Sequence, residues 1–203
     1  DVNEWNTRTI ETLPDGNQNR VYTNKAGQVI LKIFRENPAS VSTRDWYEYA
    51  EFNSHFRMVL SANSFAVASV TEPVINVNNT LTVVLKDNDG LISEQFFFDH
   101  NDDSTGAVMG YLERQTVKKG LDGESFTLVR YEYDTHVAQG QTIHPLRSRT
   151  VYPNGLGPEA GDRTEFSYTW QQEGGTDTLQ VFEKTTTYPA VPTEENGSGV
   201  AGV

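Results

Sequence analysis

Alternation of apolar and polar residues is the feature of this sequence that most constrains its fold. In the segment TEFSYTW, residues 164–170, Phe166, Tyr168 and Trp170 alternate with polar residues. Successive side chains of a β-strand point to opposite faces, so this pattern predicts a strand with one buried face. The same alternation occurs in residues 28–34, 81–86 and 126–134. The sequence therefore predicts an all-β fold.

Short turns separate the predicted strands. Residue pairs that tolerate a positive φ angle lie between the alternating segments and predict antiparallel hairpins. These pairs are Asp15-Gly16, Asp89-Gly90, Asp122-Gly123, Asn154-Gly155 and Gly174-Gly175. Residues 44–60 also fit a helix, because Trp46, Asn53 and Phe56 lie at helical spacing. Their aromatic density favours strands, and a helix stays the alternative.

The predicted hairpins recur along the chain. Phe98, Tyr133 and Tyr168 are 35 residues apart in both intervals. Each belongs to an aromatic strand that is followed by a polar link containing glycine and by a return strand rich in Thr, Arg and Lys. A unit of this size cannot cover both of its edges, so we expect its stability to come from stacking on neighbouring units.

The recurrence predicts one β-repeat segment over residues 1–190. Its approximate units are residues 15–43, 44–90, 91–123, 124–158 and 159–190. Residues 191–203 end in NGSGVAGV and have no core-forming pattern, so we expect a flexible C-terminal tail.

Composition and motifs argue against several functions. The chain has 16 Lys and Arg against 28 Asp and Glu, and its net charge of -12 disfavours nucleic acid as a partner. No apolar run approaches the roughly 20 residues that span a bilayer, so we expect no membrane insertion. Cysteine is absent, which removes disulfides and zinc-thiolate sites. HExxH, GxSxG and P-loop motifs are also absent, and we expect no catalysis.

An acidic segment, DHNDDSTG at residues 99–106, is a candidate metal site. Asp99, Asn101, Asp102 and Asp103 offer the oxygen ligands that calcium prefers. The segment lacks the spacing and the closing glutamate of an EF-hand. The alternative is a solvated acidic hairpin loop without a ligand. Calcium is the one cofactor that the sequence suggests.

Three aromatic residues are candidates for stacking on sugar rings. Trp46 lies in an aromatic segment, and Tyr168 and Trp170 lie on one face of the strand predicted at 164–170. Packing between neighbouring strands is the alternative role of such residues. A carbohydrate-binding or adhesion module is therefore a rival function.

Three segments share a pattern of an aromatic residue followed by Asn or Asp and a turn. They are RVYTNKAGQVILKIF from Arg20, EYAEFNSHFRMVL from Glu48 and VRYEYDTHVAQGQ from Val129. The shared residues are Tyr22, Asn24 and Gly27, then Phe52 and Asn53, then Tyr133 and Asp134. The pattern is similar to Tyr-Asp-x-x-Gly-Arg followed by an apolar strand, and the sequence resembles the Rhs/YD-repeat family, bacterial relatives of teneurin shells. Phe56 stands where this family usually has glycine.

Turn chemistry explains such a motif. The aromatic ring covers the neighbouring strand, the Asp or Asn side chain binds backbone N–H groups of the turn, and glycine supplies the positive φ angle. We therefore expect these residues to form structural corners rather than a ligand site.

The resemblance implies a wide antiparallel sheet whose hairpin repeats stack into a spiral, β-solenoid-like shell. It implies a non-enzymatic structural or encapsulating segment of a secreted or cell-surface protein, with neighbouring repeats as partners and an enclosed passenger protein. Open strand edges are also templates for pairing with other chains. A subunit of an extracellular self-assembling filament or layer is therefore a further alternative, beside the module that binds surface glycans.

Overall fold

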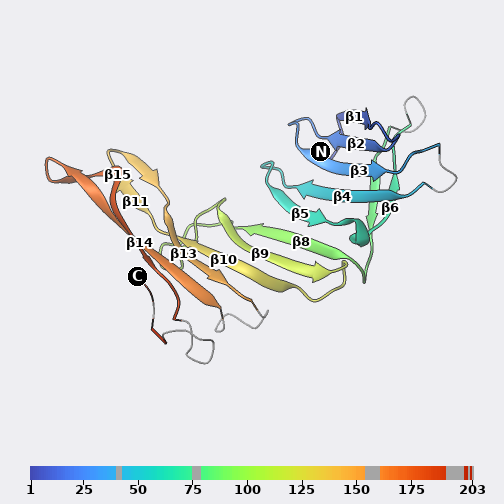
Figure 1. Cartoon of the computed structure of the whole chain (residues 1–203). Helices are drawn as coiled ribbons and strands as arrows, with labels where there is room; N and C mark the ends of the chain where they lie inside the picture. Colours follow the sequence, from blue (N-terminus) through green and yellow to red (C-terminus); the bar gives the residue numbers. More distant parts are fainter. Residues whose placement is uncertain (40–42, 75–78, 154–160, 191–198, 201, 203) are drawn as a thin grey trace. The chain divides into compact units, whose positions relative to one another are not determined.

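The computed structural model describes residues 1–39, 43–74, 79–153, 161–190, 199, 200 and 202 (Figure 1). This part of the chain contains β-strands and one short 3-10 turn, η1 (Ser64–Ala66), and no α-helix. The predicted all-β class is confirmed. The strands are β1 (Thr7–Thr12), β2 (Gln18–Thr23), β3 (Val29–Arg35), β4 (Asp45–Phe52), β5 (Met58–Ala62), β6 (Val67–Thr71), β7 (Thr82–Leu85), β8 (Leu91–Phe97), β9 (Leu112–Lys119), β10 (Phe126–Tyr133), β11 (His136–Ala138), β12 (Gln141–Ile143), β13 (Leu146–Val151), β14 (Asp162–Glu173) and β15 (Thr176–Thr187).

Most strands belong to one large sheet. Its 11 strands follow the order β1-β2-β3-β4-β5-β8-β9-β10-β13-β14-β15, and two small sheets pair β6 with β7 and β11 with β12. The sheets are antiparallel, as the predicted hairpins require, and the large sheet is not closed. Among the described strands, β1 and β15 are therefore its two edges.

The helical alternative for residues 44–60 is wrong, because this segment forms β4 and β5. The two strands pair over residues 49–52 of β4. On the other side of β4, Trp46 lies opposite Phe34 of β3, and the two ring centroids are 5.6 Å apart. Cross-strand contacts between aromatic side chains stabilise a sheet, and here they outweigh the helical spacing.

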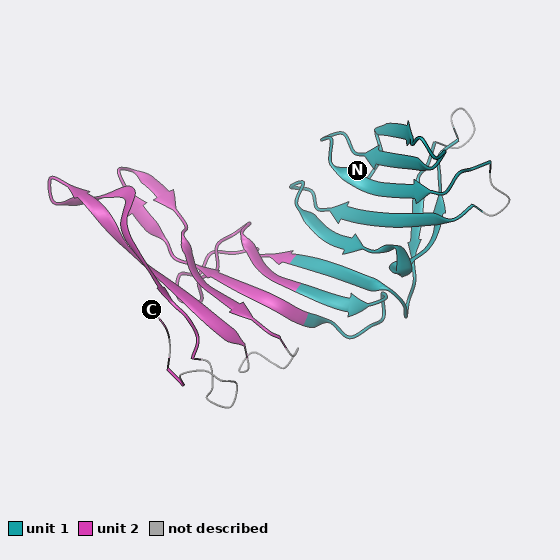
Figure 2. Ribbon diagram, viewed as in Figure 1, with its two compact units in different colours: residues 1–95, 116–126 teal, residues 96–115, 127–203 magenta. Residues whose placement is uncertain are grey.

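The chain divides into two compact units (Figure 2). Unit 1 comprises residues 1–95 and 116–126, and unit 2 comprises residues 96–115 and 127–203. Unit 1 therefore contains β1 to β7, and unit 2 contains β11 to β15.

Unit 1 has a core between two layers of strands. The buried side chains come from β2 and β3, and partly buried side chains from β6 and from β7 and its N-terminal flank pack against them. The two sets are Tyr22, Ile30, Leu31 and Ile33, and Val70, Leu81 and Val83. The small β6–β7 sheet therefore covers one face of the larger sheet and removes these apolar side chains from water.

A network of charged side chains adjoins this core at Tyr22. Glu72, which follows β6, lies 2.8 Å from Arg20 Nη1 and 2.9 Å from Arg35 Nη2. Glu72 Oε2 also accepts a hydrogen bond from the Tyr22 hydroxyl at 2.5 Å. Asp45 completes the network by accepting two hydrogen bonds from Arg35, at 2.6 and 2.7 Å.

The network shifts the pKa values of its members. Burial disfavours the charged form of Glu72, but hydrogen bonds from Tyr22 and Arg20 and the charges of Arg20 and Arg35 outweigh it and lower its pKa below 4.5. Burial and the hydrogen bond to Glu72 raise the pKa of Tyr22 to about 12. Glu72 is therefore ionised and Tyr22 protonated at neutral pH.

The turn between β2 and β3 is organised by Asn24. Asn24 Oδ1 accepts hydrogen bonds from the backbone N–H groups of Ala26 and Gln28, both at 3.0 Å. Gly27 N donates to the Asn24 carbonyl at 3.0 Å, and Gly27 has a φ of 78°. The side-chain amide thus satisfies the turn donors, and glycine provides the left-handed backbone conformation.

The turn between β4 and β5 repeats this geometry around Asn53. Asn53 Oδ1 accepts from His55 N at 3.0 Å and from Arg57 N at 3.1 Å. Phe56 N donates to the Asn53 carbonyl at 2.9 Å, and Phe56 has a φ of 59°. Gln28 Nε2 donates to the Phe56 carbonyl at 2.7 Å, so the two turns are linked directly.

In unit 2, two tyrosines 35 residues apart make the same contact. The Tyr133 hydroxyl donates to the Leu112 carbonyl at 3.1 Å, and the Tyr168 hydroxyl donates to the Leu146 carbonyl at 2.9 Å. Leu112 and Leu146 are the first residues of β9 and β13, which precede β10 and β14 in the sheet order. Phe98 follows β8, and its ring lies 6.5 Å from that of Tyr133.

Replacing Phe56 by glycine should stabilise the protein. Phe56→Gly removes the Cβ that disfavours a positive φ, while the Phe56 side chain is already 48% exposed. We expect the free energy of unfolding, measured by urea denaturation, to rise by about 1 kcal/mol. The matched change Gly27→Ala should lower it by about 1 kcal/mol, because a Cβ there meets no atom within 4 Å and only the φ angle is strained. A Phe56→Gly variant less stable than the parent would contradict this interpretation.

Acid should weaken unit 1 through Glu72. A carboxylate whose pKa is lowered by folding stabilises the fold above its unfolded pKa, and this contribution is lost as the pH falls through its folded value. We expect the free energy of unfolding to decrease below about pH 4.5, and to decrease less steeply in Glu72→Gln. At pH 7 the same variant should be about 2 kcal/mol less stable, because Arg20 loses its ion pair with Glu72 and Arg35 keeps only its ion pair with Asp45. Parallel pH profiles for the two proteins would show that Glu72 does not carry the effect.

Candidate functional site

The four predicted calcium ligands lie between β8 and β9. Asp102 Oδ1 accepts hydrogen bonds from the backbone N and the hydroxyl of Ser104, at 2.9 and 2.6 Å. These bonds lower the pKa of Asp102. Asn101 Oδ1 accepts from Met109 N at 2.7 Å. Both side chains therefore hold the shape of the loop.

The other two predicted ligands also have partners in the protein. Asp99 Oδ1 lies 2.7 Å from Nδ1 of the adjacent His100. Asp103 Oδ1 accepts a hydrogen bond from the Thr135 hydroxyl at 2.6 Å. Within the ranges that the structure describes, no group of three or more acidic or histidine side chains is arranged to hold a metal ion.

The predicted corner at Tyr133 and Asp134 differs from the turns at Asn24 and Asn53. Tyr133 ends β10, but the chain does not return directly to the large sheet. It first forms the β11–β12 hairpin, and Asp134 N then donates to the Pro145 carbonyl at 2.9 Å. β13 follows, with Leu146 opposite Tyr133. An inserted hairpin thus replaces the short turn.

Trp46 lies in a groove of unit 1. This groove has a volume of about 650 Å³, and its lining includes the rings of Phe34, Trp46 and Phe65. Lys32 and Glu48 of the same lining form an ion pair at 2.9 Å. The groove is open and apolar in part, and its charged side chains have partners within the protein, such as Glu72 for Arg20.

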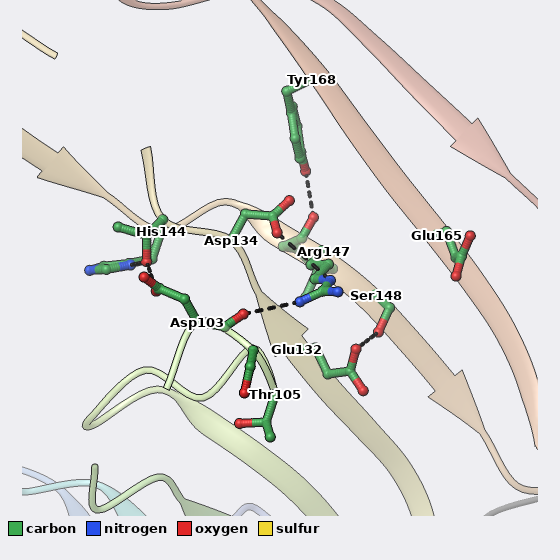
Figure 3. A network of polar contacts seen from close by, with 12 residues as sticks. Asp103, Thr105, Glu132, Asp134, His144, Arg147, Ser148, Glu165 and Tyr168 are labelled. Atoms are coloured by element: carbon green, nitrogen blue, oxygen red, sulfur yellow. Dashed lines mark hydrogen bonds and ion pairs between the residues drawn. The ribbon is translucent and has the colours of Figure 1, made fainter. Parts of the chain in front are cut away.

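Tyr168 and Trp170 contribute to a smaller cavity in unit 2. It has a volume of about 310 Å³. The lining residues come from the loop after β8, the two residues between β10 and β11, the start of β11, the residue before β13, and β14. They are Asp103, Asp134, Thr135, His136, Pro145, Tyr168 and Trp170. Figure 3 shows Asp103, Asp134 and Tyr168 with the Arg147 guanidinium nearby. The fold therefore brings two predicted sugar-stacking residues to two carboxylates.

The aromatic side of this cavity is a stack of rings. The imidazole of His136 lies parallel to the indole of Trp170, with centroids 3.7 Å apart and planes at 6°. The Tyr168 ring lies 6.0 Å from Trp170 at 25°. His136 covers one face of the indole, so Trp170 is part of a preformed wall rather than an isolated stacking platform.

Charges around the cavity are partly balanced. Arg147 Nε lies 3.8 Å from Asp134 Oδ1, and Arg147 Nη1 donates to the Asp103 carbonyl at 3.3 Å. Burial and the negative charge of Asp134 raise the pKa of Tyr168. The Tyr168 hydroxyl therefore remains protonated and keeps its hydrogen bond to Leu146.

Sequence reasoning found part of this cavity. Tyr168 and Trp170 were predicted as sugar-stacking residues, whereas Asp103 was predicted as a calcium ligand and Asp134 as a corner. His136 was missed. The signal that could have found it is the run Asp134-Thr135-His136, which places an acid, a hydroxyl and an imidazole directly after an aromatic strand.

We expect no heat of calcium binding to the intact chain in calorimetry at neutral pH. The reason is that the described residues contain no group of three or more acidic or histidine side chains arranged to hold a metal ion. Asp102→Ala should instead lower the free energy of unfolding by about 1 kcal/mol, because it removes the hydrogen bonds to Ser104. A heat of binding that Asp102→Ala and Asp103→Ala both abolish would establish the calcium site.

Comparison with protein-family models, with curated proteins and with solved structures gives no match for this chain. In the described ranges, no helix has the length and apolar character needed to cross a membrane. The functional interpretation therefore depends on the geometry of the strands, the turns and the cavity.

Proposed function

We propose that this chain is a non-enzymatic structural segment of a secreted or cell-surface Rhs/YD-repeat protein, in which its strands form part of the wall of a shell. The observation that carries the proposal is the repeated corner of unit 1. Asn24 and Asn53 bind their turns through equivalent hydrogen bonds. Phe56 adopts the positive φ that glycine adopts at Gly27. The corner geometry thus persists where the sequence motif has changed.

The contacts of the tyrosines in unit 2 support the same proposal. Tyr133 and Tyr168 bind the first carbonyl of β9 and of β13, respectively. A ring that reaches across to the neighbouring strand at a fixed interval is expected of stacked repeats. The proposal adds that the open sheet winds into a spiral in the complete protein and encloses a passenger.

The two edges of the large sheet are where neighbouring repeats would pair. All but one of the six residues of β1 are exposed. The edge formed by β15 is partly occupied near Thr178. His136 of β11 binds the Thr178 carbonyl, and the Thr178 hydroxyl accepts a hydrogen bond from Gln180 N. Residues 183–187 pair regularly with β14. Unpaired backbone groups on such edges favour the addition of further strands.

The same edges favour a second candidate function. If copies of this chain pair through β1 and β15, the product is an extracellular filament or layer. The two candidates differ in what covers the edges: further repeats of one protein, or other copies of this chain.

Hydrogen exchange separates these functions. We expect those backbone amides of residues 7–12 and 183–187 that do not bind β2 or β14 to exchange at least about tenfold more slowly in a longer protein that carries the neighbouring repeats than in the 203-residue chain. The reason is that added strands bind the free N–H groups of both edges. Residues 31–33 of β3, an interior strand of the sheet, are the internal control and should be protected equally in both proteins.

Other results would contradict the shell segment. Protection of the edges that rises with the concentration of the 203-residue chain would support the filament or layer instead. Fast exchange at both edges in the longer protein would mean that nothing pairs with them, and the wall function would then be wrong.

A further inference from the structure

We propose that the cavity of about 310 Å³ in unit 2 binds a single uncharged sugar residue, such as the end of a surface glycan. This site is separate from the structural role of the strands, and the inference does not depend on the shell. The volume lies at the lower end of the roughly 300–1,000 Å³ of small-molecule sites, so the ligand is about as large as one sugar ring.

The rings of the cavity are fixed before a ligand arrives. His136 Nε2 lies 2.9 Å from the Thr178 carbonyl, which can only accept, so this nitrogen donates. Tyr168 is held by its hydrogen bond to Leu146. Because His136 also stacks on Trp170, the wall loses little side-chain freedom on binding. An aromatic wall of this kind packs against the C–H groups of a sugar ring.

The polar side of the cavity can bind sugar hydroxyls. Asp103 Oδ1 accepts from Thr135, but a carboxylate offers about four accepting positions, so capacity remains on Asp103 and on Asp134. In a neutral imidazole, donation from Nε2 leaves His136 Nδ1 as an acceptor. The indole N–H of Trp170 is a donor. The lining residues therefore include both acceptors and donors, as hydroxyl groups require.

The charges favour an uncharged ligand over a cation. Two carboxylates beside aromatic rings would also suit an ammonium group. However, the Arg147 guanidinium already lies 3.8 Å from the Asp134 carboxylate and binds the Asp103 carbonyl. It offsets part of the negative charge that would attract a free cation. Hydrogen bonds from the hydroxyl groups of a ligand to the two carboxylates do not require a net negative charge in the cavity, so an uncharged ligand still fits.

Titration of the intact chain followed by NMR tests this site. The probes are free glucose, galactose, mannose and N-acetylglucosamine, with tetramethylammonium as the cationic comparison. We expect at least one sugar to shift the indole N–H signal of Trp170 in a saturable way at millimolar concentration, while the signal of Trp46 stays unchanged. Asp134→Asn should weaken this binding about tenfold, as expected when a hydrogen bond to a charged acceptor becomes one to a neutral amide oxygen.

Matched variants make the assignment specific. Trp170→Ala should remove the binding, and Trp46→Ala, which alters the groove of unit 1, should leave it unchanged. If Trp170→Ala does not fold, Asp134→Asn still tests the site, because the Asp134 side chain is 46% exposed. Three results overturn the proposal: no saturable shift with any sugar, binding that depends on Trp46 instead, or tetramethylammonium that binds more tightly than every sugar and is lost in Asp134→Asn.

Discussion

The sheet of unit 1 depends on one kind of interaction, in which an asparagine side chain binds the backbone N–H groups of a turn. Asn24 Oδ1 and Asn53 Oδ1 each accept from two turn amides, which sets where β2 and β4 end and where β3 and β5 begin. Because Gln28 also binds the Phe56 carbonyl, each turn helps to place the next one. Register then follows from the turn, and the alternating side chains reach the intended faces.

A sheet built in this way needs little aliphatic core. In unit 1, the small β6–β7 sheet covers the buried residues of β2 and β3. Glu72 beside β6 then ties this layer to Arg20 and Arg35 of the large sheet, and the Tyr22 hydroxyl joins the same carboxylate. Hydrogen bonds to a half-buried charge are stronger than those between neutral groups. Polar contacts thus supply part of the cohesion that a chain with 36% hydrophobic residues cannot draw from apolar packing alone.

The strands could be predicted from local sequence patterns, whereas contacts between residues far apart in the sequence could not. The alternation of Phe166, Tyr168 and Trp170 correctly predicted a strand with one half-buried face. The pairing of Glu72 with Arg20 joins residues 52 positions apart, and no local pattern marks it. The stacking of His136 on Trp170 likewise depends on where an inserted hairpin folds back. Residues 191–198 of the predicted tail and the Asn154-Gly155 turn lie outside the described residues.

The cavity of unit 2 lies beside the β11–β12 hairpin, which stands where the other two corners have a short turn. At Asn24 and Asn53 a short turn returns the chain directly to the sheet. After Tyr133 the β11–β12 hairpin intervenes, and its first residue, His136, covers Trp170 of β14. Asp134 follows Tyr133 as Asn53 follows Phe52, but it does not lie in a short turn. With Tyr168 it lines the cavity. The asparagines of the two short turns bind backbone N–H groups, whereas Asp134 lines a cavity, so the length of the connection decides the surroundings of a side chain at this position.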